Sequence, residues 1–419
     1  MNSFELNTAH IFKHDVVIVG GGSAGIAAAS SLLARSPYLD LAIIDPADMH
    51  YYQPGWTMVG GGIFKVESTG RAMADVIPVG ANWIQQAVSS FDPDHSQLTL
   101  KNGQQVEYKS LIVCPGLVLN WDAIEGLSET LGKNGVTSNY RLDLAPYTWQ
   151  LVQQLKQGKA VFTQPPMPIK CAGAPQKALY LSSDYWLKNN VLNNIEVSFY
   201  NAGAVLFGVK AYVPALMEYM QRYQAHLNFE HKLVKVDGAS KTAWFEVKKD
   251  GETKQVSTQF DMLHVVPPQH APDFIRQSAF ADAAGWFEVN PETLQHPRYA
   301  NVFALGDVIN ASNAKTAAAA RKQAPIVAVN VLMHLKGRND FCHYDGYGSC
   351  PLTVERGKIV LAEFGYGGKL LPSFPRWLCD GEKPTKLAWF LKARMLPEIY
   401  WKGMLKGREW LVKPKRHAA

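Results

Sequence analysis

One cysteine of this 419-residue chain stands where a thiol would be chemically reactive. Cys171 follows Lys170 directly, and Pro175, a short distance further on, suits the first turn of a helix. A thiol beside an ammonium group and a helix N-terminus has a lowered pKa, because both features stabilise the thiolate. The pattern therefore predicts a nucleophilic thiolate at Cys171, and the alternative is a small residue packed in the core.

The other four cysteines have less informative surroundings. Cys350 lies beside a proline, in what we expect to be a turn that leads into a strand at Leu352–Val354. Cys114 closes an apolar run and is typical of a packing residue, while no motif surrounds Cys342 or Cys379. There is no Cys-x-x-Cys pair and no zinc-ligand spacing, so we predict no metal site. Five cysteines in a chain of this length also exclude a disulfide-rich secreted scaffold.

Near the N-terminus, a glycine-rich segment is placed as a dinucleotide-binding loop requires. The apolar run Asp15–Val19 predicts a buried parallel strand, and it leads into Gly-Gly-Gly-Ser-Ala-Gly at residues 20–25 and then an Ala/Leu-rich helix. A second apolar run, Leu41–Ile44, ends at Asp45, which would bind a ribose hydroxyl. The helix N-terminus would attract the phosphates. In this motif Gly20 allows the tight turn, Gly22 lets the backbone approach a pyrophosphate, and Gly25 allows the helix to pack on the strand.

The strand predicted at Lys159–Thr163 is not followed by a second glycine-rich loop. The segment after it contains four prolines by residue 175, and it carries Cys171 where a pyrophosphate cradle would lie. We therefore expect an electron donor that reacts through sulfur rather than a nicotinamide. The alternative is an NADH:quinone oxidoreductase of the same fold.

The order of the predicted elements indicates an α/β protein with two Rossmann-like dinucleotide-binding domains. A hydrophobic content of 47% and a charged content of 19% fit a globular enzyme and exclude a disordered chain. No apolar run is long enough to span a membrane, and we recognise no signal peptide. We expect a discontinuous nucleotide-binding domain (1–150 and 270–345), a second domain with Cys171 (151–269) and a C-terminal region with Cys350 (346–419).

Basic and aromatic residues accumulate at the C-terminal end of the chain. From Gly381 onward there are ten Lys or Arg residues against three Glu. Basic amphipathic helices with tryptophan suit a membrane interface, whereas core packing or a dimer contact is the alternative. No nucleic-acid recognition motif accompanies the charge, and deletion after Asp380 is expected to leave a soluble flavoprotein. The residues at helical spacing, in two stretches separated by Pro397, are Leu387, Phe390, Leu391 and Met395 with Lys386, Lys392 and Arg394, then Trp401, Met404 and Leu405 with Lys402, Lys406 and Arg408.

Over nearly its whole length the chain resembles the sulfide:quinone oxidoreductases, especially the group that includes the mitochondrial enzyme. The motifs around Cys171 and Cys350 are the most specific part of this resemblance. The segments that carry it are Gly20–Gly25, Tyr52–Pro54, Ile169–Lys177, Phe207–Lys210, Met262–His264, Asp282–Trp286, Thr293–His296, Gly306–Asp307, Lys315–Ala318, Tyr344–Tyr347, Ser349–Pro351 and Leu361–Phe364.

The resemblance implies that the first domain binds FAD. It places Asp307 at the ribityl chain and Lys315-Thr316 at the flavin near the quinone end. A helix that begins there would stabilise the negative charge of the reduced flavin. The implied cofactor-binding residues are Gly20, Gly22, Ser23, Ala24, Gly25, Asp45, Gln53, Val88, Gly116, Gly306, Asp307, Lys315, Thr316, Ala317 and Ala318.

The resemblance also implies the reaction. Cys171 and Cys350 would form a redox-active disulfide, or a trisulfide with one extra sulfur, which hydrosulfide attacks on the Cys350 side while Cys171 faces the flavin. Electrons would pass to ubiquinone or another membrane quinone, and the sulfane sulfur to an acceptor such as glutathione, sulfite or sulfide. Glu363 and Phe364 would line a quinone channel or belong to the core. A flavoprotein subunit with a cytochrome partner and a non-enzymatic FAD-binding protein are further alternatives.

The resemblance finally implies a location. The enzyme would be a peripheral membrane protein at a bacterial cytoplasmic membrane, or at the mitochondrial inner membrane if the source is eukaryotic. A homodimer is compatible with this arrangement.

Overall fold

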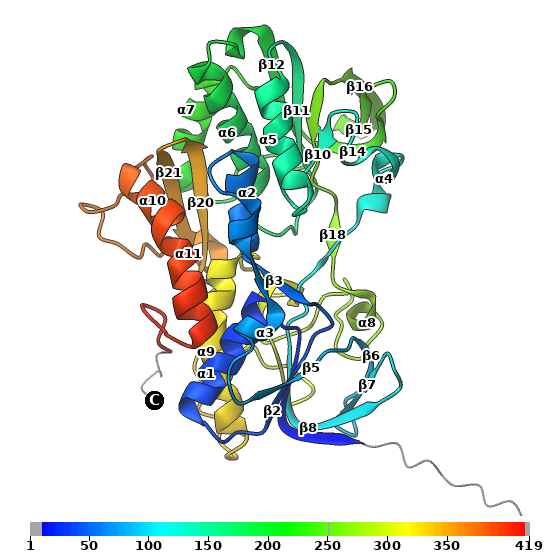
Figure 1. Cartoon of the computed structure of the whole chain (residues 1–419), viewed down its shortest axis with the longest axis vertical. Helices are drawn as coiled ribbons and strands as arrows, with labels where there is room; N and C mark the ends of the chain where they lie inside the picture. Colours follow the sequence, from blue (N-terminus) through cyan, green and yellow to red (C-terminus); the bar gives the residue numbers. More distant parts are fainter. Residues whose placement is uncertain (1–10, 250–251, 415–419) are drawn as a thin grey trace, which may run out of the picture.

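The computed structural model describes residues 11–249 and 252–414, which form two α/β lobes (Figure 1). The chain leaves the first lobe through β9 (Val118–Leu119) and returns to it through β18 (Gln269–His270). These two short strands pair with each other in antiparallel orientation between the lobes. The first lobe is therefore built from two separate parts of the chain.

A seven-stranded sheet forms the centre of the first lobe, and its buried strand β1 holds the glycine-rich loop at one edge of the sheet. The second half of β1 (Phe12–Val19) is a run of Val and Ile whose four last residues are all buried. Such a run suits a parallel strand with both faces covered. Val19 lies beside Ile44 of β2 on one side and Val113 of β8 on the other. The carboxyl ends of these strands therefore meet at one edge. The other strands and bounds are β2 (Leu41–Ile44), β5 (Ala81–Ile84), β6 (Val88–Asp92), β7 (Gln97–Leu100), β8 (Gln105–Val113) and β19 (Val302–Ala304).

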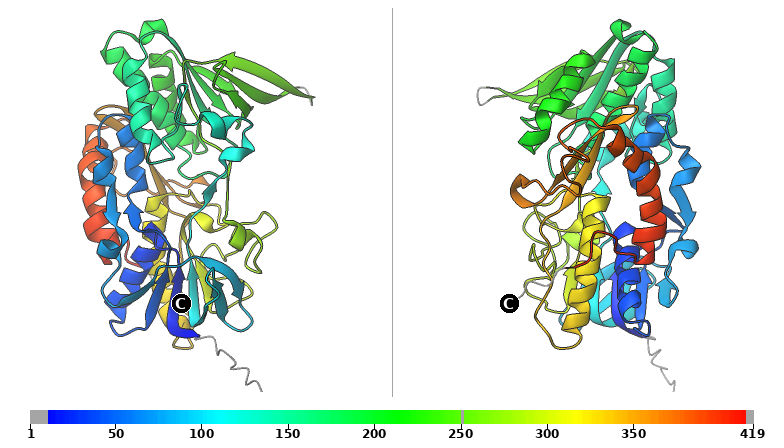
Figure 2. Two further views of the ribbon diagram at one scale, coloured as in Figure 1. Left: turned by 45° about the vertical axis from the view of Figure 1, so that its right-hand side comes forward. Right: turned by 90° about the vertical axis from the view of Figure 1, so that its left-hand side faces the viewer.

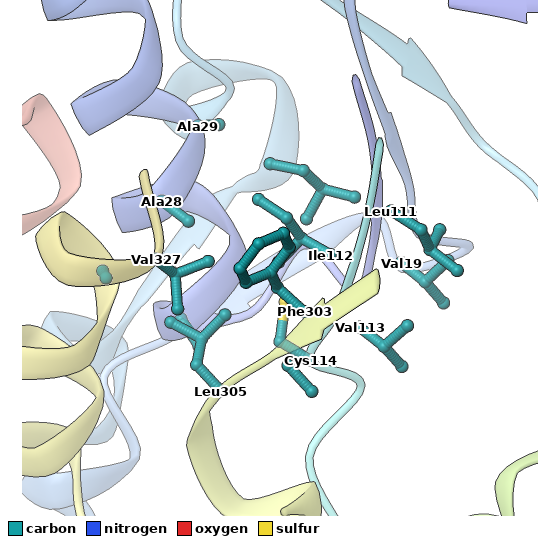
Figure 3. Close-up of a cluster of buried hydrophobic side chains, with 14 of the residues drawn as sticks. Val19, Ala28, Ala29, Leu111, Ile112, Val113, Cys114, Phe303, Leu305 and Val327 are labelled. Atoms are coloured by element: carbon teal, nitrogen blue, oxygen red, sulfur yellow. The ribbon is translucent and has the colours of Figure 1, made fainter. Parts of the chain in front are cut away.

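Two helices, α1 (Ser23–Arg35) and α9 (Ala317–His334), cover one face of this sheet. Figure 3 shows Ala28 of α1 and Val327 of α9 beside Ile112 and Phe303 of the sheet. These four side chains are fully buried. The alanines of α1 leave room for α9 to pack closely against it, so the starts of both helices lie near the edge where the strands end.

A second, five-stranded parallel sheet forms the other lobe, in the order β10-β17-β11-β12-β13. Its first strand, β10, lies before residue 151, so the lobe takes in residues that we expected in the first domain. A two-residue strand carries no alternation signal, which is why the sequence did not reveal this boundary. The bounds are β10 (Val136–Thr137), β11 (Gly158–Gln164), β12 (Ile195–Asn201), β13 (His226–Phe229), β17 (Met262–His264), α5 (Leu144–Gln154), α6 (Ala174–Lys188) and α7 (Val213–Arg222).

An antiparallel sheet of three strands extends from this lobe (Figure 2). Its strands are β14 (His231–Asp237), β15 (Thr242–Lys249) and β16 (Glu252–Gln259). The remaining short elements are β3 (Met49–Tyr51), β4 (Gly70–Ala72), α2 (Trp56–Gly60), α3 (Met73–Val76), α4 (Leu127–Thr130) and α8 (Asp273–Arg276).

Cys350 lies inside a strand, not in a turn as expected. It belongs to β20 (Gly348–Glu355), which pairs with β21 (Lys358–Phe364) so that Cys350 lies opposite Ala362. The hairpin packs against α6 of the second lobe. Pro351 suggested a turn, but β20 has only one partner strand in its sheet, and such an edge position tolerates a proline.

The C-terminal segment is one continuous helical stretch from Lys386 to Lys406, and Pro397 does not divide it. Its parts are α10 (Lys386–Phe390), a π-helical turn (Leu391–Met395), α11 (Leu396–Glu398), a second π-helical turn (Ile399–Gly403) and a final 3₁₀ turn (Met404–Lys406). Pro397 lies between the two π-helical turns, where the regular α-helical hydrogen-bond pattern is already interrupted, so its missing N–H is tolerated. The stretch runs beside α1, as both views show (Figures 1 and 2).

The two halves of this stretch have different surroundings. Leu387, Phe390 and Met395 are exposed, as expected for an interface, but Met404 and Leu405 are buried in the core against the first lobe. The interface prediction is therefore wrong for the second half. In residues 11–249 and 252–414, no helix has both the length and the hydropathy to cross a bilayer. Lys415 and Arg416 of the basic tail lie outside the described residues.

Candidate active site

The structure brings Cys171 and Cys350 together. Their Sγ atoms lie 3.6 Å apart without a covalent bond. Cys171 is half-buried in the turn before α6 and has a positive φ of 49°, a conformation that few non-glycine residues adopt. Cys350 is buried and comes from β20. A Cβ added at Gly173 would lie 2.5 Å from the Cys350 Sγ, so this glycine permits the approach of the two thiols.

Lys177, rather than Lys170, is the cation beside the thiols. Its Nζ donates a hydrogen bond to the Cys171 Sγ over 3.2 Å, from the first turns of α6. The pKa of Cys171 is well below its usual range, because the Cys350 thiol donates a hydrogen bond to it and the Lys177 ammonium lies close by. The pKa of Cys350 is raised, because its proton is committed to Cys171 and because the thiol is buried. The pair therefore holds one thiolate and one thiol.

A second buried lysine reaches the same place from the C-terminal stretch. Lys392 is 3% exposed, and its Nζ donates a hydrogen bond to the carbonyl of Pro54 over 2.9 Å. Burial, and secondarily the Lys177 ammonium, lower the pKa of Lys392 to about 7. We expected Lys392 at a membrane interface, and that prediction is wrong. The sequence around Lys392 does not indicate that it lies near Cys171, because the two residues are brought together only by the way the C-terminal helical stretch packs in the folded protein.

Lys170 points away from the thiols and towards the first lobe. Its Nζ donates a hydrogen bond to the Gln53 Oε1 over 2.6 Å and lies over the rings of Trp56 and Tyr140. The Tyr140 hydroxyl donates to the carbonyl of Lys170, which holds the turn before α6 in place. Lys170 still attracts the Cys171 thiolate electrostatically, but it makes no hydrogen bond to it and is not, as the sequence had suggested, the main cation beside it.

The turn with Cys171 is joined to the nucleotide-binding lobe through Lys315. The Cys171 N–H donates to the carbonyl of Lys315 over 2.8 Å. The Lys315 Nζ donates to the carbonyls of Asp307 and Ile309, and burial lowers its pKa to about 8. Helix α9 begins two residues later, with Thr316 as its N-cap. The start of α9, expected at the flavin, thus lies beside the candidate nucleophile.

The glycine-rich loop fits a bound dinucleotide. Gly20 has a φ of +109°, and a Cβ there would meet the Cys114 carbonyl at 2.5 Å. Gly22 and Gly116 instead have open space where a Cβ would lie, so the backbone can approach a ligand closely. Gly22 caps α1 without a side chain and no acidic residue follows in the first turn, which leaves the N–H groups available for an anion. These features fit the FAD that the family resemblance implies.

The acid of the motif lies where expected. The Asp45 Oδ2 accepts a hydrogen bond from the Gly21 N–H over 2.6 Å, and its Oδ1 accepts one from Ala47. Each carboxylate oxygen keeps a further lone pair for a ribose hydroxyl. Asp307 follows β19 in the turn before α9, and burial raises its pKa. The other residues that the resemblance implies as FAD contacts belong to the first lobe: Ser23, Ala24, Gly25, Gln53, Val88, Gly306, Ala317 and Ala318.

The other cysteines lie away from the thiol pair. Cys114 is buried against the glycine-rich loop, where its Sγ is 3.5 Å from the Gly20 carbonyl (Figure 3), and burial raises its pKa. Cys342 is buried in the first lobe, and Cys379 lies in a small cluster next to β21. Their positions suit packing.

Comparisons with known proteins identify relatives over most of the chain. Residues 14–154 match the family model described as pyridine nucleotide-disulphide oxidoreductase. The mitochondrial sulfide:quinone oxidoreductase of Dictyostelium discoideum is 43% identical over 95% of this chain and 87% of its own length. The mitochondrial enzyme of Mus musculus is 38% identical over 94% and 87%. The crystal structure of the sulfide:quinone oxidoreductase from Aquifex aeolicus superposes with a TM-score of 0.78 at 21% identity, covering 94% of this chain and 92% of that one.

Proposed function

This chain belongs to the sulfide:quinone oxidoreductases, FAD-dependent enzymes with sulfide and a quinone as substrates, and we propose that Cys171 and Cys350 carry its sulfide chemistry. The observation that supports this proposal is the 3.6 Å separation of the two sulfurs beside the Lys177 ammonium. A disulfide between them requires the sulfurs to approach by about 1.5 Å. On oxidation the pair would form this disulfide, or a trisulfide with one extra sulfur between the two cysteines.

The polarity of the pair indicates which sulfur is attacked. Hydrosulfide attacks the Cys350 sulfur of the disulfide, the S–S bond breaks, and Cys171 leaves as a thiolate while Cys350 becomes a persulfide. A sulfur with a low pKa is the better leaving group, and Cys171 has the lower pKa of the two. Lys177 neutralises the charge that develops on Cys171 at this step.

The cycle closes when the sulfane sulfur moves to a nucleophilic acceptor, such as glutathione, sulfite or sulfide, and leaves a thiolate at Cys350. Re-formation of the disulfide from the two thiolates then releases two electrons. FAD, when bound at the first lobe, would supply the acceptor for this electron pair and the connection to the quinone. Each turnover oxidises one sulfide to the sulfane level and reduces one quinone, so the electrons balance.

Two buried lysines favour anionic reactants at the pair. Lys177 and Lys392 are both 3% exposed and both act on the two cysteines electrostatically. Buried charges interact more strongly than exposed ones, because little water screens them. Hydrosulfide and an anionic acceptor would therefore be attracted to the site.

Anaerobic titration with sulfide tests the proposal. In Cys171→Ser and Cys350→Ser, sulfide-dependent loss of flavin absorbance should slow by at least about a hundredfold while FAD stays bound. Cys379→Ser is the matched control, because Cys379 is also buried but lies in a separate cluster. Parental rates in either active-site variant would disprove the assignment.

We further propose that the enzyme binds a membrane surface peripherally, so that its quinone can enter from the bilayer. Exposed apolar side chains gather on the first half of the C-terminal stretch and the segment before it, where Lys386 and Arg394 are also exposed. Apolar side chains mixed with cations suit an anionic lipid surface. The membrane would be a bacterial cytoplasmic membrane or the mitochondrial inner membrane. The apolar residues are Trp377, Leu378, Leu387, Phe390 and Met395.

Sedimentation with vesicles that contain anionic lipids tests this surface. Phe390→Glu should weaken vesicle binding by about tenfold or more, because it places a carboxylate where an aromatic ring would meet the lipid. Val79→Glu is the control, since Val79 is fully exposed in another part of the first lobe. Equal binding by Phe390→Glu and the parent would contradict the proposal.

A further inference from the structure

The C-terminal stretch also reaches the glycine-rich loop, through Tyr400. This residue lies in the second π-helical turn and is 3% exposed. Its hydroxyl is 2.6 Å from the Ser23 Oγ at the start of α1 and 2.6 Å from the His50 Nε2. The His50 Nδ1 is in turn 3.1 Å from the Gly21 carbonyl. Tyr400 and His50, which come from separate segments, thus connect to the glycine-rich loop at Ser23 and at Gly21 through a chain of hydrogen bonds.

The chemistry of the groups fixes the direction of these hydrogen bonds. The Gly21 carbonyl can only accept, so the His50 Nδ1 carries the proton and donates it. Burial lowers the pKa of His50, so the imidazole is neutral and its Nε2 accepts from the Tyr400 hydroxyl. The Tyr400 oxygen then accepts from Ser23. The only other acceptor near the Tyr400 hydroxyl in the described part of the chain is the Tyr51 carbonyl, at the longer distance of 3.5 Å.

We propose that His50 and Tyr400 are positioning residues that clamp the FAD phosphate loop at Gly21 and Ser23. This inference rests on the binding of the FAD pyrophosphate at the loop. The clamp fixes the carbonyl of Gly21 and the side chain of Ser23, so the N–H groups at the start of α1 are oriented before the cofactor arrives. A site that is ordered in advance loses less entropy on binding and therefore binds more tightly.

Aromatic packing surrounds the two residues of the clamp. The Tyr52 ring packs against the Tyr400 ring with centroids 4.8 Å apart, and the His50 ring packs against Trp401 at 5.8 Å. Arg71 also packs against Trp401, 4.8 Å from the ring centroid. A π-helical turn holds Tyr400, and such turns are frequent at functional sites. The C-terminal stretch thereby contributes to the cofactor site as well as to the thiol site.

Release of FAD from the holoenzyme tests the clamp, followed by the rise in flavin fluorescence after dilution. Tyr400→Phe keeps the ring packing but leaves the His50 Nε2 and Ser23 without their partner, so FAD should leave about tenfold faster. His50→Leu should have a similar effect. Because both residues act through one network, the double variant should release FAD no more than about twofold faster than the worse single variant.

Ser30→Ala is the matched control. The Ser30 Oγ donates to the Leu405 carbonyl, so it anchors the same C-terminal stretch to α1 but contacts no part of the phosphate loop. Ser30→Ala should release FAD at the parental rate. FAD release by Tyr400→Phe within twofold of the parent, or an equal acceleration in Ser30→Ala, would overturn the clamp. The readout involves no sulfide, so it is independent of the roles of Cys171 and Cys350.

Discussion

At the scale of single residues, the reactivity of the site depends on which partner each sulfur has. Cys171 and Cys350 are both enclosed by protein, yet one has a lowered and the other a raised pKa. The hydrogen bond between them shifts the two pKa values in opposite directions, and the Lys177 ammonium stabilises the negative charge of the pair. The sequence indicated a reactive thiol at Cys171, but it suggested the wrong lysine as its partner.

Replacement of Lys177 should therefore change the pH dependence of Cys171. In Lys177→Met the cation is lost, so the pKa of Cys171 rises towards its ordinary value and less thiolate is present at neutral pH. Alkylation of the reduced enzyme by iodoacetamide at neutral pH should slow by about tenfold, and the midpoint of its pH profile should move upward. Lys177→Arg keeps the charge and should stay near the parental profile. An unmoved midpoint in Lys177→Met would show that the hydrogen bond from Cys350 alone sets the pKa.

At the scale of elements, local sequence patterns predicted those helices, strands and loops whose formation depends on residues close together in the sequence. The strand, loop and helix from Phe12 to Arg35 and the start of α6 at Ala174 were evident, because their apolar runs, glycines and Pro175 act within a few residues. The strand at Cys350 and the unbroken helix through Pro397 were not. Both depend on tertiary partners, namely β21 for the first and α1 for the second, which local propensity does not reveal.

Gly173 is the element-scale position that we expect to be most sensitive. It caps α6 with φ of −86°, which alanine can adopt, but the Cβ of an alanine would lie 2.4 Å from Leu352 and 2.5 Å from the Cys350 Sγ. Gly173→Ala should lower the free energy of unfolding by about 1–3 kcal/mol and slow sulfide-dependent flavin reduction, because the hairpin must move away from α6. Chemical denaturation and the anaerobic titration measure the two effects. Gly208→Ala, with open space around its Cβ, should match the parent in both.

At the scale of the whole molecule, the C-terminal stretch connects the proposed membrane surface, the thiol pair and the glycine-rich loop. Its exposed face carries Phe390, while its inner face carries Lys392 to the thiols and Tyr400 to the glycine-rich loop. The deletion after Asp380 that we expected to leave a soluble flavoprotein would remove both inner groups. The electrostatic interaction between Lys392 and Cys171 connects segments far apart in the chain, so composition and periodicity could indicate an amphipathic helix but not what lies beside its inner face.

The buried amine of Lys392 should make stability depend on pH. Burial, then the nearby Lys177 ammonium, lower its pKa to about 7, whereas the negative charge of the Cys171–Cys350 pair acts in the opposite direction. An unfolded chain keeps the proton of Lys392 up to an ordinary lysine pKa of about 10.4, so between these values the unfolded state binds more protons and stability rises with pH. Below pH 7 both states are protonated and this dependence vanishes.

Urea unfolding of the parent and Lys392→Met at a series of pH values isolates this contribution. The stability of the parent relative to the variant should rise by about 1 kcal/mol per pH unit from pH 7 to pH 9, because the other titrating groups cancel in the difference. Lys386→Met changes an exposed lysine on the same helical stretch and should give a flat difference. A flat or falling difference for Lys392→Met would mean that the amine keeps its proton inside the folded protein, where Cys171 and Cys350 would then have to neutralise it.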